Sequence, residues 1–189
     1  MGDDPLASKP PNRAVFLDRD GVLNAPVVRD GKPYPPATLA EFQLLEGVAV
    51  ACQRLKAAGF LLVVATNQPD VGRGTQSKEV VEAMHARLCA ELPLDRVECC
   101  FHAGNGAVCS CRKPAPGMLL RAAAALEIDL ARSYMVGDRW RDIDCGSSAG
   151  CQTVFIERGY AERLRTPPNF TACDLPEAAQ AILGKSWHA

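Results

Sequence analysis

Short apolar runs that end in polar or glycine residues dominate the pattern of this chain. Residues 14–17, 61–65 and 134–136 are the clearest, and residues 96–101 and 153–156 have the same character. Runs of this length with such boundaries are typical of buried parallel strands. We therefore expect five strands of one sheet.

Segments that favour helices lie between and after these runs. Residues 48–58 and 78–91 place apolar side chains on one face, and Ser77 is expected to cap the second helix. Residues 118–126 follow a proline suited to a first helical turn, and a last helix is expected near residues 176–183. The alternation predicts the α/β fold class: one Rossmann-like domain with a central parallel sheet flanked by helices.

The chain length fits one domain. Its 189 residues can bury a single full core, and they argue against two. We expect this domain over residues 13–184, with an embedded cysteine-rich loop at 99–112 and no large cap domain. Residues 1–12 lack the apolar region of a signal peptide and are expected to form a flexible tail, as are residues 185–189. The proline-rich stretch 24–46 is expected to be irregular, and so long a loop is usually functional.

Charge and cysteine content narrow the classes of function. A net charge of −1 gives no basis for binding nucleic acid or an anionic membrane, and no apolar stretch is long enough to cross a bilayer. Nine cysteines, an odd number, do not suit a disulfide framework and favour a cytoplasmic enzyme with a metal site and scattered buried thiols. We also expect a monomer. Five of them are expected to be small core residues: Cys52, Cys89, Cys145, Cys151 and Cys173.

Polar residues follow the apolar runs in a pattern that indicates phosphate chemistry. Asp18 and Asp20 follow the first run, Thr66 the second, and Asp138 follows residues 134–136, while Lys113 lies in a further polar motif. In open α/β sheets ligands bind at the carboxyl ends of the strands, so these side chains are expected to share one crevice. Three carboxylates, a hydroxyl and an ammonium can handle a phosphate together with Mg²⁺.

The aspartate pair suits covalent catalysis. Gly21 lets the backbone turn, so that Asp18 and Asp20 can face the same crevice. One carboxylate can then attack phosphorus while the other handles protons, provided that a cation offsets the repulsion between anions. An isolated Asp-x-Asp would favour a solvated turn, but further motifs in order after strands favour the active site.

A second cluster has the ligand spacing of a metal site. Cys100 and His102, followed by Cys109 and Cys111, supply three thiolates and an imidazole, which form a closed tetrahedral site for structural Zn²⁺. Cys99 is a rival ligand, but adjacent strand residues point to opposite faces, and the C-x-H spacing favours Cys100. The alternative is a loop with unpaired thiols near one histidine.

Four motifs resemble those of the haloacid dehalogenase superfamily of phosphatases. The first is Phe-Leu-Asp-Arg-Asp-Gly-Val-Leu-Asn at residues 16–24. The others are Ala-Thr-Asn-Gln at 65–68, Arg-Lys-Pro at 112–114, and Val-Gly-Asp at 136–138 with Asp142. Their form resembles a branch of the superfamily that hydrolyses heptose 1,7-bisphosphate or histidinol phosphate. That branch carries a similar zinc loop.

The resemblance implies roles for the carboxylates. Asp18 would become an aspartyl phosphate, and Asp20 would protonate the leaving alkoxide and then activate water. Asp18, the backbone carbonyl of Asp20, and Asp138 would hold Mg²⁺. These roles make the chain an Mg²⁺-dependent phosphomonoesterase.

The resemblance also assigns the substrate contacts. Thr66 and Lys113 would hold the phosphoryl group, and Asn67 and Arg112 would meet the rest of the substrate. Asp142 would orient Lys113 or a metal-bound water. Arg112 favours a sugar bisphosphate, because a second phosphate suits a guanidinium fork.

Several alternatives remain open at this stage. Histidinol phosphate is the alternative substrate, because residues 25–34 match the heptose branch poorly. A catalytically idle binding domain of the same fold would predict a damaged first motif, which is intact here. A nucleic-acid end phosphatase is disfavoured by the lack of a basic stripe. Arg73 and Arg139 are further candidates near the crevice, and His85 is expected to be structural.

Overall fold

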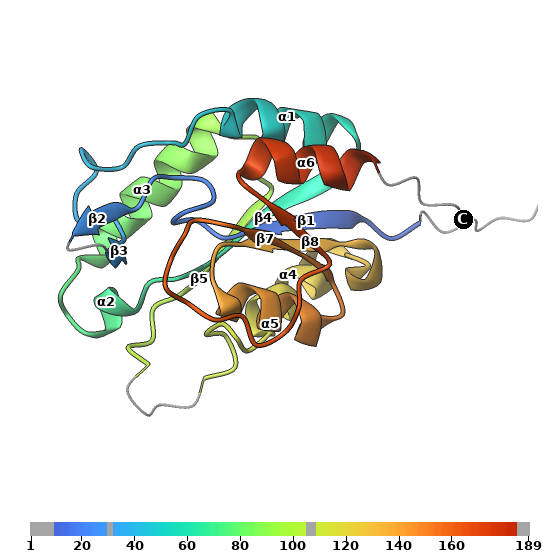
Figure 1. Cartoon of the computed structure of the whole chain (residues 1–189). Helices are drawn as coiled ribbons and strands as arrows, with labels where there is room; N and C mark the ends of the chain where they lie inside the picture. The colour runs from blue at the N-terminus through green and yellow to red at the C-terminus, as the bar shows by residue number, and fades with distance from the viewer. Residues whose placement is uncertain (1–9, 30–31, 105–108, 185–189) are drawn as a thin grey trace, which may run out of the picture.

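A six-stranded parallel sheet forms the centre of the computed structural model, which describes residues 10–29, 32–104 and 109–184 (Figure 1). Its strands follow the order β5-β4-β1-β6-β7-β8, and all neighbouring pairs are parallel. The strands are β1 (Arg13–Leu17), β4 (Phe60–Asn67), β5 (Arg96–Cys100), β6 (Tyr134–Gly137), β7 (Gln152–Ile156) and β8 (Phe170–Ala172). Residues 1–9 of the tail predicted at 1–12, and the whole tail predicted at 185–189, lie outside the described residues.

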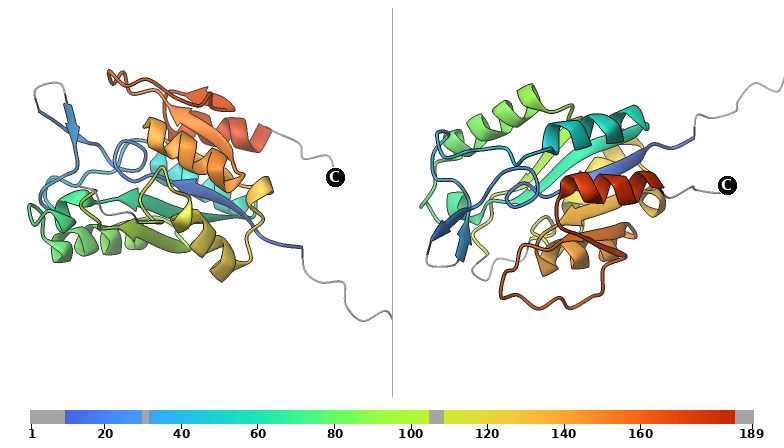
Figure 2. Two further views of the ribbon diagram at one scale, coloured as in Figure 1. Left: turned by 90° about the horizontal axis from the view of Figure 1, so that it is seen from below. Right: turned by 45° about the horizontal axis from the view of Figure 1, so that its top comes forward.

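Helices cover both faces of the sheet (Figures 1 and 2). One face carries α1 (Val48–Ala57), α3 (Lys78–Glu91) and α6 (Leu175–Gly184), and the other carries α4 (Gly117–Leu126) and α5 (Trp140–Ala149). A short helix α2 (Pro69–Gly72) follows β4, and a 3₁₀ turn (Leu130–Arg132) precedes β6. Ser77 caps α3 by accepting a hydrogen bond from the N–H of Val80, as predicted.

The central strand β1 shows why the sequence of a strand in this sheet is a continuous apolar run. Val15 and Leu17 pack into the core beneath α1, α3 and α6, while Ala14 and Phe16 pack with α4 and α5. All four side chains are fully buried. Because both faces are covered, no polar residue interrupts the run. The predicted α/β fold with a parallel sheet is confirmed.

Three local expectations were wrong. The stretch expected to be irregular contains a hairpin of β2 (Val27–Arg29) and β3 (Lys32–Tyr34), and β8 was not predicted. Cys89 and Cys173 are exposed, not small core residues, whereas Cys52, Cys145 and Cys151 are buried as expected. Within the described residues, none of the helices is long and apolar enough to span a membrane.

The topology fixes where a ligand can bind. From β1 the chain proceeds to β4 and β5 on one side, and later to β6, β7 and β8 on the other. The carboxyl ends of β4, β1 and β6 are therefore adjacent at the point where the strand order reverses, which is where open α/β sheets bind ligands. Figures 1 and 2 show the β2–β3 hairpin at the same end of the molecule as α2.

Candidate active site

The end of β1 places a carboxylate against a buried lysine. Oδ1 of Asp18 accepts a hydrogen bond from the backbone N–H of Arg19 at 2.8 Å. Nζ of Lys113 lies 2.8 Å from the same oxygen and 2.6 Å from Oδ1 of Asp142, and it donates to the carbonyl of Ala65 at 2.6 Å. Burial alone would lower the pKa of Lys113, but the two carboxylates outweigh it and raise this pKa above its usual value. The lysine therefore stays protonated.

Asp138, directly after β6, adds a third carboxylate. Oxygens of Asp18, Asp138 and Asp142 lie within 4.8 Å of one another. Oδ1 of Asp138 is buried and has no hydrogen-bond partner among the described residues. Burial raises the pKa of Asp18 to about 6 despite the Lys113 ammonium, and burial with the charge of Asp18 raises the pKa of Asp138 well above its usual value. One ammonium faces three crowded carboxylates, and a divalent cation would complete this set.

Asp20 lies in a separate network of hydrogen-bond donors. Nη2 of Arg19 lies 3.0 and 2.9 Å from its two carboxylate oxygens. Asn24 Nδ2 donates to Oδ1 at 3.0 Å, and Gln68 Nε2 donates to Oδ2 at 2.8 Å. Burial alone would raise the pKa of Asp20, but the guanidinium and these donors outweigh it and lower the pKa. Asp20 is therefore ionised, and Gly21 follows it with the predicted left-handed turn at φ 90°.

A buried arginine and a histidine support Asp20 from behind. Arg19 is fully buried, and its Nη1 lies 3.3 Å from Nε2 of His85 on α3. Burial and the Arg19 cation lower the pKa of His85 to about 4, so the ring is neutral. Its Nε2 can then accept a hydrogen bond from the Arg19 guanidinium. His85 is structural, as expected, and its partner is now identified.

Thr66 and Asn67 end β4 beside this cluster. The Thr66 hydroxyl is buried and accepts a hydrogen bond from Gln68 Nε2 at 3.0 Å. The Asn67 amide pairs with the backbone of Lys113, donating to its carbonyl at 3.1 Å and accepting from its N–H at 3.0 Å. Asn67 thus holds the lysine in place, while its contact with a substrate stays a prediction.

One cavity of about 370 Å³ opens over these residues. The aspartates and Lys113 line it, and Tyr34 of the β2–β3 hairpin lines it as well. Four arginines complete its wall: Arg73, Arg112, Arg139 and Arg141. The cavity therefore combines a reactive group of carboxylates with a cationic rim, which suits a substrate carrying more than one negative charge.

The four arginines differ in their partners. Arg73 forms an ion pair with Asp70 at 3.0 Å, and Arg139 forms a double contact with Glu162 at 2.7 and 3.1 Å. Nη1 of Arg112 donates to the carbonyl of His102 at 3.1 Å, and Arg112 forms no ion pair within the part of the chain that the structure describes. Arg73 and Arg139 line the cavity, but their charges are already matched.

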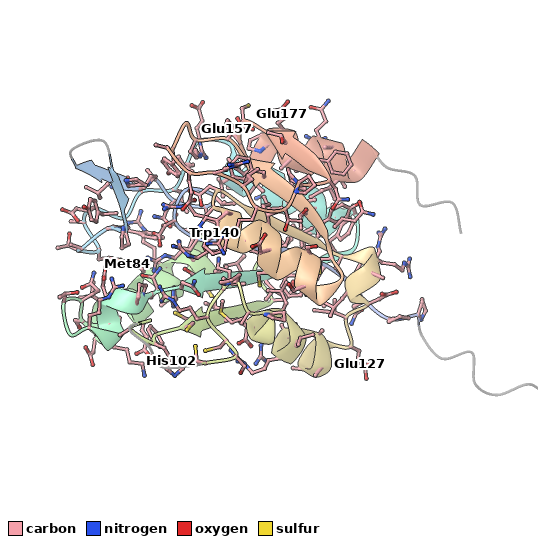
Figure 3. All side chains as sticks on the ribbon, turned by 60° about the horizontal axis from the view of Figure 1, so that its bottom comes forward. Met84, His102, Glu127, Trp140, Glu157 and Glu177 are labelled. Atoms are coloured by element: carbon pink, nitrogen blue, oxygen red, sulfur yellow. The ribbon has the colours of Figure 1, made fainter. Side chains whose placement is uncertain are left out.

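The four predicted zinc ligands lie together beside the cavity. Sγ of Cys111 is 3.3 Å from Sγ of Cys100, 3.6 Å from Sγ of Cys109 and 3.2 Å from Nδ1 of His102. Cys100 Sγ lies 3.8 Å from Cys109 Sγ and 3.4 Å from His102 Nδ1. Cys99 is not a member of the cluster. Figure 3 labels His102 in this region, where sulfur atoms gather.

The cluster has the dimensions of a tetrahedral zinc site. With Zn–S distances of about 2.3 Å, the sulfurs of a tetrahedron are roughly 3.8 Å apart. The backbone N–H of Arg112 donates to Sγ of Cys109 at 3.3 Å, a contact that stabilises thiolate charge. The predicted loop begins later than expected, because Cys99 and Cys100 belong to β5.

Comparisons with known proteins agree with this geometry. A family described as HAD-hydrolase-like matches residues 110–178. A D-glycero-beta-D-manno-heptose-1,7-bisphosphate 7-phosphatase of Yersinia pestis is 40% identical over 77% of this chain and 80% of its own length. A D-glycero-D-manno-heptose-1,7-bisphosphate 7-phosphatase of Thermosynechococcus vestitus is 37% identical over 91% of this chain and 96% of its own.

A solved structure extends the comparison to three dimensions. The D,D-heptose 1,7-bisphosphate phosphatase of B. bronchiseptica, complexed with magnesium and phosphate, superimposes with a TM-score of 0.73 at 31% identity. The match covers 90% of this chain and 98% of that one. The chain therefore belongs to the haloacid dehalogenase superfamily. Within it, the chain is a phosphatase, an enzyme that hydrolyses phosphoric monoesters.

Sequence reasoning missed three groups that shape the site. Gln68 bridges Thr66 and Asp20, and its place directly after Thr66 and Asn67 was the available signal. Asn24 ends the first motif and donates to Asp20, so its position in that motif was a similar signal. Glu162, which neutralises Arg139, lies in a long loop without periodicity and gave no signal.

Proposed function

We propose that this phosphatase is Mg²⁺-dependent and removes the 7-phosphate of D-glycero-D-manno-heptose 1,7-bisphosphate through an aspartyl phosphate at Asp18. One observation carries the proposal. The Asp18 carboxylate lies against Lys113 in a cavity that also contains Asp20 and the cationic Arg112. A nucleophile, an acid–base group and a site for a second anion are thus within reach of one small substrate.

The first half-reaction follows from the contacts of Asp18. Oδ1 is held by Lys113 and the N–H of Arg19, so Oδ2 is the oxygen free to attack phosphorus. The bond between phosphorus and the sugar oxygen breaks, and Asp20 delivers a proton to that oxygen. Because Asp20 is ionised in the free protein, this proton must reach it before or together with the substrate.

The second half-reaction restores the enzyme. Water attacks the phosphorus of the aspartyl phosphate, and the Asp20 carboxylate accepts its proton. The bond between phosphorus and the Asp18 oxygen breaks, which releases inorganic phosphate and a free carboxylate. Lys113 and the Thr66 hydroxyl hold the phosphoryl oxygens in both halves.

The residues present fit Mg²⁺. Asp18, the backbone carbonyl of Asp20, and Asp138 would hold it, and the partnerless Oδ1 of Asp138 among crowded carboxylates supports this assignment. The ion would supply positive charge that offsets repulsion between the Asp18 carboxylate and the phosphate. Asp142, which contacts Lys113 at 2.6 Å, would serve to orient the lysine.

The second cluster fits Zn²⁺ in a structural role. Cys100, His102, Cys109 and Cys111 offer four soft ligands at tetrahedral spacing, and four protein ligands leave no open coordination position. The ion would fix the start of the segment that ends at Lys113. The cytoplasmic location and the monomeric state stay predictions.

The electrostatics of the cavity favour a bisphosphate over histidinol phosphate. Arg112 has no carboxylate partner in residues 10–29, 32–104 and 109–184, and it suits a second phosphate. Histidinol phosphate carries an amine that is cationic at neutral pH, which a cationic rim would repel.

A phosphate-release assay tests the proposal directly. The purified chain is incubated with Mg²⁺ and heptose 1,7-bisphosphate, histidinol phosphate or an aryl phosphate. We expect the highest kcat/KM for the heptose bisphosphate, with loss of the 7-phosphate and not the 1-phosphate by phosphorus NMR. Faster hydrolysis of histidinol phosphate would contradict the substrate assignment and leave the phosphatase chemistry intact.

A further inference from the structure

Arg141 lies in the wall of the active-site cavity and forms no ion pair with any of the residues that the structure describes. It is the second residue of α5, is half-buried, and lines the cavity with Asp18 and Arg112. In the described part of the chain it makes no hydrogen bond and no ion pair. Its guanidinium lies 4.9 Å from the ring centre of Trp140, which Figure 3 labels at the start of α5.

The position of Arg141 is electrostatically unfavourable. The first turn of a helix carries positive partial charge, so a cation there lowers helix stability and an anion raises it. Burial and the positive charges of Arg139 and Arg112 lower the pKa of Arg141, and they outweigh the attraction of Glu162 and Asp142. The two carboxylates nearby are engaged elsewhere, since Glu162 contacts Arg139 and Asp142 contacts Lys113.

Two other arginines of the cavity have the carboxylate partner that Arg141 lacks among the described residues. Arg73 has Asp70 and Arg139 has Glu162, so each of these charges is matched within the protein. Arg112 and Arg141 form no ion pair with a carboxylate of the described residues. An arginine charge in a cavity wall that no carboxylate of the protein pairs with is typical of a binding site.

We propose that Arg141 and Arg112 together bind the phosphate of the substrate that is not hydrolysed, which makes Arg141 a specificity-determining residue. The proposal rests on the proposed function, since it assumes a substrate with two phosphates. A phosphate offers three acceptor oxygens, enough for two guanidinium groups. Its negative charge would also compensate the positive end of α5.

The experiment compares two substrates and two matched variants. In R141Q, we expect kcat/KM for heptose 1,7-bisphosphate to fall about 10- to 100-fold, the usual effect of a lost charged hydrogen bond. Hydrolysis of p-nitrophenyl phosphate should change less than about twofold, because this substrate offers no second phosphate. R73Q removes an arginine from the same cavity that is already paired, and we expect it to change both activities less than about threefold.

Thermal unfolding separates a binding role from a structural one. Because Arg141 opposes the helix dipole, R141Q without substrate should unfold at the same temperature as the parent chain or higher. R141K keeps the charge without the fork and should recover part of the bisphosphate activity.

Three results would overturn the inference. These are an equal loss on both substrates, an equal bisphosphate loss in R73Q, and a lowered unfolding temperature that accounts for the activity loss. If the parent chain itself does not prefer the heptose bisphosphate over the aryl phosphate, the proposed function fails first. The inference is then tested with the same variants on fructose 1,6-bisphosphate, where an unchanged R141Q would reject it.

Discussion

The aspartate–lysine cluster and the cysteine–histidine cluster lie side by side but are assembled in opposite ways. Asp18, Lys113 and Asp138 come from distant parts of the chain, and the sheet brings two strand ends together to place the aspartates. The four ligands of the other cluster lie within residues 100–111, and Cys100 alone belongs to a strand. The first cluster is positioned by the fold, whereas the proposed Zn²⁺ would hold the second together.

The internal contacts of the clusters differ in the same sense. The Lys113 ammonium joins two carboxylates, so the aspartate–lysine cluster has a cation of its own. Beside the cysteine cluster, the Arg121 guanidinium interacts with Cys111, but its charge is already paired with Glu98. We therefore expect substitutions in the first cluster to change turnover more than stability, and substitutions in the second to do the reverse.

The sharpest test of this contrast is Asp18→Asn. The amide cannot form an acyl phosphate, so we expect kcat to fall about 10⁴-fold or more in a phosphate-release assay with Mg²⁺. The pKa of Asp18 is raised from 3.8 to about 6 in the folded protein, so its ionisation reduces stability as the pH rises through this range. The metal-free variant at pH 7 should thus unfold at the same temperature or higher. Substantial residual turnover would remove Asp18 from its role.

The next effect concerns Asp20→Asn. Its loss should slow hydrolysis of an alkyl phosphate by about 10²- to 10³-fold, and hydrolysis of an aryl phosphate much less, because an aryl leaving group needs little protonation. Thermal unfolding is recorded on the same samples, since Arg19 loses its ion pair in this variant. Equal losses on both substrates, with chemistry rate-limiting, would argue against the acid role.

A smaller effect is expected at the rim. Arg112→Ala should reduce kcat/KM for a bisphosphate by roughly 1.5–3 kcal/mol, about 10- to 150-fold, and leave an aryl phosphate nearly unaffected. The measurement is the ratio of the two kcat/KM values in variant and parent. A parallel loss on both would mean that Arg112 acts on the reacting phosphate or on the loop.

The largest effect on stability is expected in the cysteine cluster, with a smaller loss of turnover than at Asp18 or Asp20. Purified protein should contain about one zinc per chain. Cys109→Ser should lower both the zinc content and the unfolding temperature, because binding energy at such sites contributes to folding. Cys89→Ser changes an exposed cysteine outside the cluster and is the matched control. Protein purified without chelators that contains no zinc would contradict the assignment.

The sequence predicted the parts of the molecule that depend on burial along one strand or helix. The runs at β1, β4 and β6 are apolar because both faces of the sheet are covered, and the reactive residues follow directly where each strand ends. The hairpin of β2 and β3 was missed because three-residue strands carry no periodicity, and Pro33 argues against a strand.

Pairwise contacts across the fold were not predictable. Whether an arginine is matched depends on residues brought near by tertiary structure, as Glu162 is to Arg139. Asn67 was expected to meet the substrate, but its amide is engaged with the backbone of Lys113, a residue 46 positions away. No local pattern encodes such a pairing.

Because of that pairing, residues 109–113 form a short, fixed connection between the two clusters. At one end, the side chains of Cys109 and Cys111 belong to the cysteine cluster. At the other, the Asn67 amide forms hydrogen bonds with both the N–H and the carbonyl of Lys113, as the backbone of a neighbouring strand would. Only two peptide units separate Cys111 from Lys113. We therefore expect a displacement of the sulfurs to reach the backbone of Lys113, with the Asn67 contacts limiting how far that backbone moves.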